Sequence, residues 1–181
     1  MDEAKPAAGK KLSHEETLAW IREHRAWRHA RKTKPIWARE LEPDDIGKEL
    51  TTADHANEVA REGYWLCVGV AEEPWFQKPA KVEEKYDLAG EEEKQFTFDS
   101  APRKYRVFKP KEGVRNWVAQ IAAPGIEGFY IRPGYDMDRP LYSPAGGYVV
   151  TGDVADPYTA QLDDVWLVQQ PLFESTYEID R

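Results

Sequence analysis

The chain has 181 residues, of which 41% are hydrophobic and 32% are charged, and its formal net charge is −8. This length suits one compact domain or two small ones, because a module much below about 60 residues buries too little surface to be stable alone. The longest apolar runs are only a few residues long, which excludes a membrane-spanning helix, and the start of the chain lacks the hydrophobic stretch of a secretory signal. We therefore expect a cytoplasmic protein, and its single cysteine, Cys67, cannot form an internal disulfide.

The N-terminal region is predicted to begin with a tail and to continue as a helix. Residues 1–12 are rich in Lys, Ala, Pro and Gly, and we predict that they are disordered. Residues 13–34 are predicted to form a basic, amphipathic helix. Ser13 and Glu16 have the spacing of a capping box at its start, and the proline after Lys34 ends it.

A stripe of basic side chains follows the predicted helix. Four arginines recur at every third position: Arg22, Arg25, Arg28 and Arg31. One interpretation is a binding surface for phosphate or acidic groups. The other, which we favour, is a solvated helix face whose late cations suit the negative end of the helix dipole and pair with acidic side chains elsewhere.

The charges of the chain are unevenly distributed. Residues 1–34 carry nine Lys or Arg against five Asp or Glu, whereas the remainder carries 16 against 28. An acidic body repels phosphate backbones at long range. Nucleic acid would therefore have to be bound by the basic N-terminal arm alone.

Two stretches of the chain share one pattern of aromatic residues. Seven residues separate Trp75 from Val82 and four more lead to Tyr86, and the same intervals join Trp166, Phe173 and Tyr177. Each block follows a glycine and an apolar run, at Gly63 to Gly69 and at Gly147 to Gly152. Fixed aromatic spacing with changing residues between is expected of a shared core and not of a catalytic motif.

We therefore predict an α+β protein, in which the N-terminal amphipathic helix packs on two related, small, antiparallel β-rich modules that arose by internal duplication. The first module spans residues 35–88 and the second spans residues 105–181. Residues 89–104 contain a run of three glutamates and are predicted to form an acidic linker.

The second module has longer loops than the first. Residues 129–145 are dense in Gly, Pro and Tyr, and 19 residues separate Gly147 from Trp166, against 12 between Gly63 and Trp75. Long loops in compact domains are often functional. Tyrosine is also a frequent anchor in protein interfaces. The candidate binding residues of this region are Tyr130, Tyr135, Asp136 and Tyr142.

One part of the second module resembles a known family. The segment from Gly147 to Gly152, followed by the strand Val165 to Val168 and the run Phe173 to Glu178, is similar to small bacterial and phage domains of the PGDYG type. In this chain Ala145-Gly146-Gly147 replaces the leading Pro-Gly-Asp. The resemblance implies a small β-rich unit in a bacterial or phage setting. It implies no chemistry, because such domains lack an assigned activity.

The sequence contains no motif typical of a catalytic or metal site. All four histidines lie within the first 55 residues, and none has a cysteine at zinc-ligand spacing. The pairs Asp136/Asp138 and Asp163/Asp164 lack the framework of a calcium loop. A nucleophile elbow, a phosphate-binding glycine loop and a dinucleotide fingerprint are all missing. Glu83 and Glu174, equivalent in the two copies, could form a carboxylate pair, but duplication explains them without function. We predict no metal and no cofactor.

By elimination, the sequence favours a non-enzymatic binding protein whose partner is another protein, and the resemblance to PGDYG-type domains implies a phage or mobile-element origin. The partner would meet the loop at residues 129–145 and the basic helix. The first alternative is a nucleic-acid-binding protein that uses the arginines of the helix. The segments Arg103 to Arg106 and Lys109 to Lys111 would supply further cations interleaved with aromatic residues. The second alternative is an enzyme with a composite site between the two modules. The oligomeric state stays open.

Overall fold

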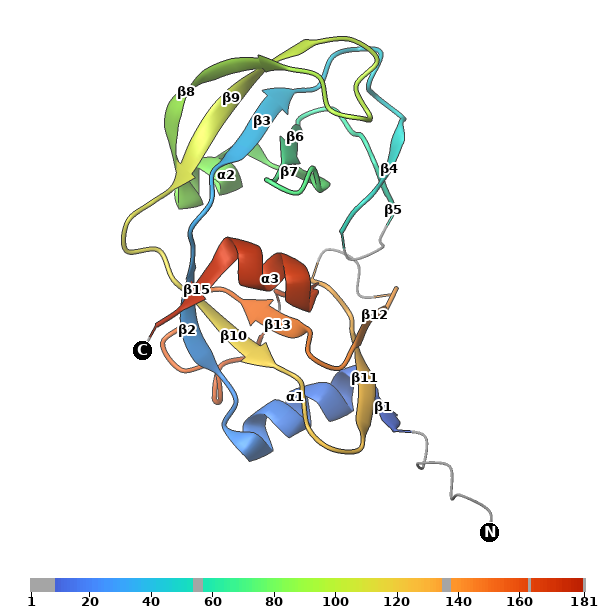
Figure 1. Ribbon diagram of the computed structural model, residues 1–181, viewed down its shortest axis with the longest axis vertical. Helices are drawn as coiled ribbons and strands as arrows, with labels where there is room; N and C mark the ends of the chain where they lie inside the picture. The colour runs from blue at the N-terminus through green and yellow to red at the C-terminus, as the bar shows by residue number, and fades with distance from the viewer. Residues whose placement is uncertain (1–8, 54–56, 135–137, 163, 181) are drawn as a thin grey trace. The chain divides into compact units, whose positions relative to one another are not determined.

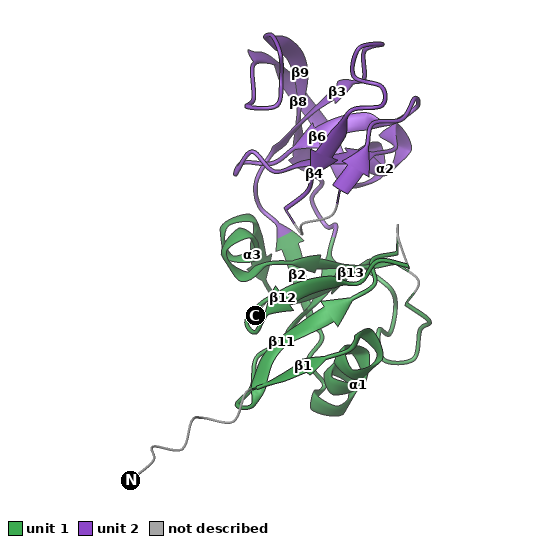
Figure 2. Ribbon diagram, turned by 90° about the vertical axis from the view of Figure 1, so that its right-hand side faces the viewer, with its two compact units in different colours: residues 1–31, 115–181 green, residues 32–114 purple. Residues whose placement is uncertain are grey.

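The computed structural model of the chain describes residues 9–53, 57–134, 138–162 and 164–180. Of these residues, 42% lie in strands and 15% in three short helices. The chain is therefore mostly β, and the prediction of an α+β fold with a packed N-terminal helix is wrong. The described chain forms two compact units: residues 1–31 with 115–181 make up unit 1, and residues 32–114 make up unit 2 (Figure 2).

The N-terminal helix is much shorter than predicted. Helix α1 spans His14–His24, and the predicted capping box of Ser13 and Glu16 is present at its start. The helix ends because Arg25 adopts a left-handed conformation (φ 50°, ψ 49°) and its N–H bonds back to the last turn. Strand β1 (Lys10–Leu12) precedes the helix, in part of the predicted tail.

Residues that were predicted to continue the helix form strand β2 (Arg28–Lys32) instead. Ala30 is fully buried in the core of unit 1, and the ring of His29 stacks on Trp117 with centroids 3.6 Å apart. These contacts are made with residues far along the chain. Tertiary packing has therefore overridden the helical spacing of the arginines.

Unit 1 is built on a five-stranded sheet in the order β14-β13-β10-β2-β15. The new strands are β10 (Asn116–Gln120), β13 (Tyr148–Thr151), β14 (Val165–Val168) and β15 (Tyr177–Ile179). Helix α3 (Gln170–Thr176) lies on one side of this sheet and α1 on the other (Figure 1). Phe173 of α3 stacks on Tyr148 and Tyr177 in the buried core beneath it.

A second sheet of unit 1 has three strands in the order β1-β11-β12. Strand β11 spans Ile126–Ile131 and β12 spans Leu141–Pro144. The short β1 runs parallel to β11 at one edge of this sheet, and β12 runs antiparallel at the other.

Unit 2 also contains a five-stranded sheet, in the order β7-β6-β3-β9-β8, and a small two-stranded one, β4-β5. The strands are β3 (Ile36–Glu40), β4 (Glu49–Thr51), β5 (Asn57–Val59), β6 (Trp65–Val68), β7 (Pro74–Gln77), β8 (Tyr86–Lys94) and β9 (Arg103–Pro110), and the helix is α2 (Pro79–Lys85).

The predicted acidic linker differs from the structure, because its first part belongs to the sheet. Residues 89–94 continue β8, which pairs antiparallel with β9. Glu91 lies opposite Arg106 and Glu93 opposite Lys104 in this pairing. Opposite charges across the two strands thus balance the glutamate run, which by itself predicts a linker.

The two five-stranded sheets correspond position by position. In each, a hairpin, a seven-residue helix and an edge strand follow one another along the chain. Trp75 packs against the core of unit 2 and Trp166 against that of unit 1, and the residues around them occupy matching strand positions. The two registers show that Trp65 in the sheet of unit 2 is equivalent to Tyr148 in the sheet of unit 1. Gly63 is therefore equivalent to Gly146 and not to Gly147. Both Gly63 and Gly146 have positive φ angles, 89° and 104°.

Candidate functional site

The exposed side of the three-stranded sheet carries a group of aromatic and basic side chains, which we call the tyrosine face. It consists of Lys11, Gly128, Tyr130 and Tyr142. Lys11 is paired with Gly128 in the register of β1 and β11, and Tyr130 is directly opposite Tyr142 in the register of β11 and β12. Side chains at such positions project from the same side of a sheet. Residues from three strands therefore meet on one surface.

The ring of Tyr142 is the centre of the tyrosine face. Its centroid lies 5.0 Å from that of Tyr130, and the two rings are tilted by 50°. The ammonium group of Lys11 lies 5.3 Å from the centroid of Tyr142. A Cβ atom at Gly128 would overlap the hydroxyl of Tyr142, so the missing side chain leaves room for this ring to lie across β11.

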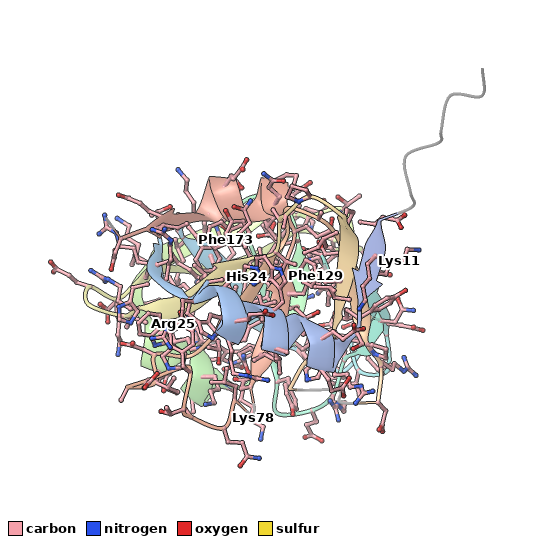
Figure 3. All side chains as sticks on the ribbon, turned by 90° about the horizontal axis from the view of Figure 1, so that it is seen from below. Lys11, His24, Arg25, Lys78, Phe129 and Phe173 are labelled. Carbon is pink, nitrogen blue, oxygen red and sulfur yellow. The ribbon has the colours of Figure 1, made fainter. Side chains whose placement is uncertain are left out.

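Residues that alternate with the tyrosine face anchor its strands in the interior. Phe129 and Ile131 of β11 are fully buried, and Leu141 and Ser143 of β12 are buried as well. Figure 3 shows Lys11 at the periphery of unit 1 and Phe129 further inside. The alternation along both strands holds the two tyrosines half-buried, with their rings on the solvent side.

Helix α1 fixes the backbone at the C-terminal end of β11. The hydroxyl of Thr17 donates to the carbonyl of Tyr130 (3.2 Å), and the backbone N–H of Arg132 donates to Nδ1 of His14 (2.9 Å). Burial lowers the pKa of His14; the Glu15 carboxylate raises it in part, and the Arg132 guanidinium adds to the lowering. A neutral His14 is the form that can accept this hydrogen bond.

The structure describes two of the four candidate residues of the predicted loop region. It brings Tyr130 and Tyr142 together, as described. Tyr135 and Asp136 lie outside the described residues, and so does Asp163 of the second acidic pair. Tyr130 and Tyr142 lie on strands and not on a loop. Regular alternation of inward and outward side chains therefore positions them, which is more rigid than a loop would be.

The four arginines of the predicted stripe do not share one surface element. Arg22 lies in the last turn of α1, and Arg25 lies beyond it with its guanidinium 3.9 Å from the ring centroid of Tyr158. Arg28 and Arg31 lie on β2, and Arg31 forms an ion pair with Glu178 (3.2 Å). Because the helix ends at His24, a spacing of three residues no longer places these arginines on one helix face. The described residues therefore form no continuous cationic helix face.

Two of the other cations offered for nucleic-acid binding form ion pairs within unit 2. Arg103 pairs with Glu42 and with Asp44, and Lys104 pairs with Glu91 (3.1 Å). The aromatic ring among them, Tyr105, is fully buried. A buried ring cannot stack on a base.

The long hairpin tip between β13 and β14 holds the connection from α1 to β2. The hydroxyl of Tyr158 accepts a hydrogen bond from the backbone of Trp27 (3.1 Å). Nε1 of Trp117 donates to the carbonyl of Val154 (2.7 Å), and His29 pairs with Asp153 (3.1 Å). The extra length of this hairpin, which the sequence marked as a place for function, has a structural role.

Unit 2 contains a buried polar network that the sequence did not predict. The guanidinium of Arg39 donates to both carboxylate oxygens of Asp45 (2.7 and 3.0 Å), to Asp99 (3.2 Å) and to the hydroxyl of Tyr105 (3.2 Å). Tyr105 in turn donates to Asp99 (2.6 Å). The hydrogen bond from Arg39 lowers the pKa of Asp45. These hydrogen bonds and ion pairs satisfy the polar groups of the network within unit 2. We therefore assign the network a structural role, in which it attaches two loops to the sheet.

The remaining groups of chemical interest have structural surroundings. Burial raises the pKa of Cys67 to about 12, which keeps its thiol protonated and unreactive. Burial also raises the pKa of Tyr86, whose hydroxyl accepts from Lys32 (2.7 Å). Glu83 and Glu174 are exposed on α2 and α3, one in each unit.

Within the described ranges, His, Cys, Asp and Glu side chains form no group of three or more that could hold a metal ion. None of the helices in the same ranges has the length and apolar character needed to cross a membrane.

Neither a protein-family model, nor a curated protein, nor a solved structure matches the chain. The resemblance to PGDYG-type domains therefore stays a prediction. The residues that carry it lie mainly on β13, β14 and α3, around the core of unit 1, and not on the strands that bear Lys11, Tyr130 and Tyr142.

Proposed function

We propose that this protein is a non-enzymatic binding protein, and that its tyrosine face contacts a protein partner. The observation that carries the proposal is the cross-strand pair of Tyr130 and Tyr142, which places two aromatic rings and the Lys11 ammonium side by side on one sheet surface. The resemblance of the second module to phage and bacterial domains supports a setting in a phage or mobile element.

The chemistry of this surface suits a protein interface. Tyrosine is enriched among residues that contribute most of the binding energy, because it offers a large, rigid ring with a polar tip at low entropic cost. The strands that carry both rings are anchored by buried neighbours. Little conformational freedom remains to be lost on binding, which favours affinity.

The nucleic-acid alternative has less support. Its proposed cations are distributed over separate elements or paired with carboxylates, and such pairs must break before a phosphate can be bound. We therefore treat nucleic-acid binding as an outcome of the test and not as a second proposal.

The test uses the whole protein as bait in affinity purification, with the captured proteins identified by mass spectrometry. Tyr130→Ala and Tyr142→Ala should weaken binding of the identified partner about thirtyfold, since an anchoring tyrosine contributes about 2 kcal/mol or more. Tyr142→Phe keeps the ring and should retain most of the affinity.

The matched control is Tyr64→Ala. Tyr64 is also half-buried and has an arginine, Arg61, 5.2 Å from its ring centroid, but it belongs to unit 2. Capture that is unchanged by both tyrosine-face variants would refute the assigned surface. If the captured material is lost after nuclease treatment, and its retention falls steeply as the salt concentration rises, the protein binds nucleic acid instead.

A further inference from the structure

Each of the two five-stranded sheets contains one strand that comes from the opposite half of the chain. The sheet of unit 1 takes β10, β13, β14 and β15 from the C-terminal part of the chain, but its remaining strand, β2, comes from the N-terminal part. The sheet of unit 2 takes β3, β6, β7 and β8 from the N-terminal part. Its remaining strand, β9, begins only at Arg103.

Both of these strands occupy internal positions. Strand β2 lies between β10 and β15, and β9 lies between β3 and β8. Three residue pairs join β2 to β10, and the backbone N–H of Asp180, just after β15, donates to the carbonyl of His29 (2.8 Å). Without β2, strand β15 would lose its neighbour. Without β9, β8 would lose its neighbour as well.

Each of the two strands also fills the hydrophobic core of the sheet that it joins. Ala30 of β2 is fully buried in the cluster that contains Phe173 and Tyr177 of the C-terminal part. Phe108 of β9 is buried in the cluster that contains Val82 and Tyr86 of the N-terminal part. Ala30 and Phe108 occupy the same position in their sheets, since Ala30 pairs with Asn116 and Phe108 pairs with Ile36.

We infer that the two halves of the chain, residues 1–100 and 101–181, interlock by exchanging β2 for β9. Each half carries four strands of one five-stranded sheet and gives one strand, β2 or β9, to the five-stranded sheet of the other half. The crossings are short: residues 33–35 join β2 to β3, and residues 111–115 join β9 to β10. The halves thus form an obligatory pair of partners within one chain, and the covalent link between β8 and β9 is not what holds them together.

The link can be cut in the full-length protein without removing any strand. Ser100 and Ala101 are exposed, whereas Asp99 just before them is buried. A protease recognition site inserted between Ser100 and Ala101 therefore allows cleavage of the folded protein. Exposed loops between paired strands are the usual sites at which a nick is tolerated.

After cleavage, the two halves should elute from a native size-exclusion column at the volume of the uncut protein and separate only in denaturant. Amide hydrogen exchange of the cut protein should match that of the intact protein in all ten strands of the two large sheets. Halves that separate in native buffer, each with protected amides, would overturn the inference, because independent modules need no exchanged strand.

Point variants in the cut protein test each exchanged strand separately. Ala30→Asp should increase exchange in β10 and β13, which belong to the other half, and leave β3 and β6 unchanged. Phe108→Asp should do the reverse. If the Asp variants do not fold, the milder changes Ala30→Thr and Phe108→Leu take their place. They should give the same pattern of increased exchange to a smaller extent.

The controls place the same charge on exposed positions of the same two strands. Arg28→Asp and Lys109→Asp should leave both the elution volume of the cut protein and its amide exchange pattern nearly unchanged. A pattern in which Ala30→Asp loosens β3 and β6, or Phe108→Asp loosens β10 and β13, contradicts the exchange.

Discussion

Replacement of Arg39 by Met should destabilise unit 2 severely while it leaves unit 1 intact. The side chains of Arg39, Asp45 and Asp99 are only 6%, 9% and 0% exposed, so removal of the cation leaves two carboxylates buried without their charged partner. Breaking a buried ion pair in this way costs about 3–5 kcal/mol. Because Asp99 keeps its hydrogen bonds from Tyr105 and from the backbone of Phe96, we expect a value near the lower end, about 3 kcal/mol.

Urea unfolding followed by hydrogen exchange and mass spectrometry measures this effect for each unit. Peptides from β3, β6 and β9 report on unit 2, and peptides from β10 and β13 report on unit 1. The matched control is Arg106→Met, which removes a half-exposed cation 3.7 Å from Glu40 and should cost less than about 1 kcal/mol. A loss below about 1 kcal/mol for Arg39→Met would refute the view that the network ties loops to the sheet.

Three further predictions concern acid stability, thiol reactivity and the tyrosine face. Because the hydrogen bond from Arg39 lowers the pKa of folded Asp45, this carboxylate contributes stability above the usual Asp pKa of about 4, and the contribution is lost as the pH falls below it. The urea midpoint of unit 2 should therefore drop between pH 6 and pH 3, and Asp45→Asn should flatten this dependence; an equally steep drop in the variant contradicts the assignment. Cys67, with its pKa raised to about 12, should resist thiol reagents at pH 8 until the protein unfolds, and rapid labelling of the native protein would count against its burial. Gly128→Ala should displace the ring of Tyr142, lower the melting temperature and weaken partner binding, whereas unchanged values of both would show that the ring does not need the space.

Local patterns predicted the parts of the fold that depend on neighbouring residues. The capping box of Ser13 and Glu16 is present, and the shared spacing that includes Val82 and Phe173 marks the buried residues of α2 and α3. Such features need only a few residues of context, so a single sequence reveals them.

The features that could not be predicted depend on residues far apart in the chain. Arg28 to Lys32 has a spacing compatible with a helix, and only its pairing with β10 makes it a strand. The glutamates of β8 resemble a linker until β9 supplies their opposite charges. Likewise, Arg39 finds its partners Asp99 and Tyr105 some sixty residues later. A charged residue within the apolar β3 was the available signal for this network, since an inward-pointing cation requires a buried acceptor.

The parallel β1 at the edge of the three-stranded sheet has a practical consequence for the choice of affinity tag. Lys11 of β1 is part of the tyrosine face. A tag fused close to the start of β1 would lie near the rings and would shield them from a partner. The C-terminal strand β15 belongs to the other sheet of unit 1 and lies away from β1 (Figure 1). Bait proteins immobilised through the C-terminus therefore leave the tyrosines open to the lysate.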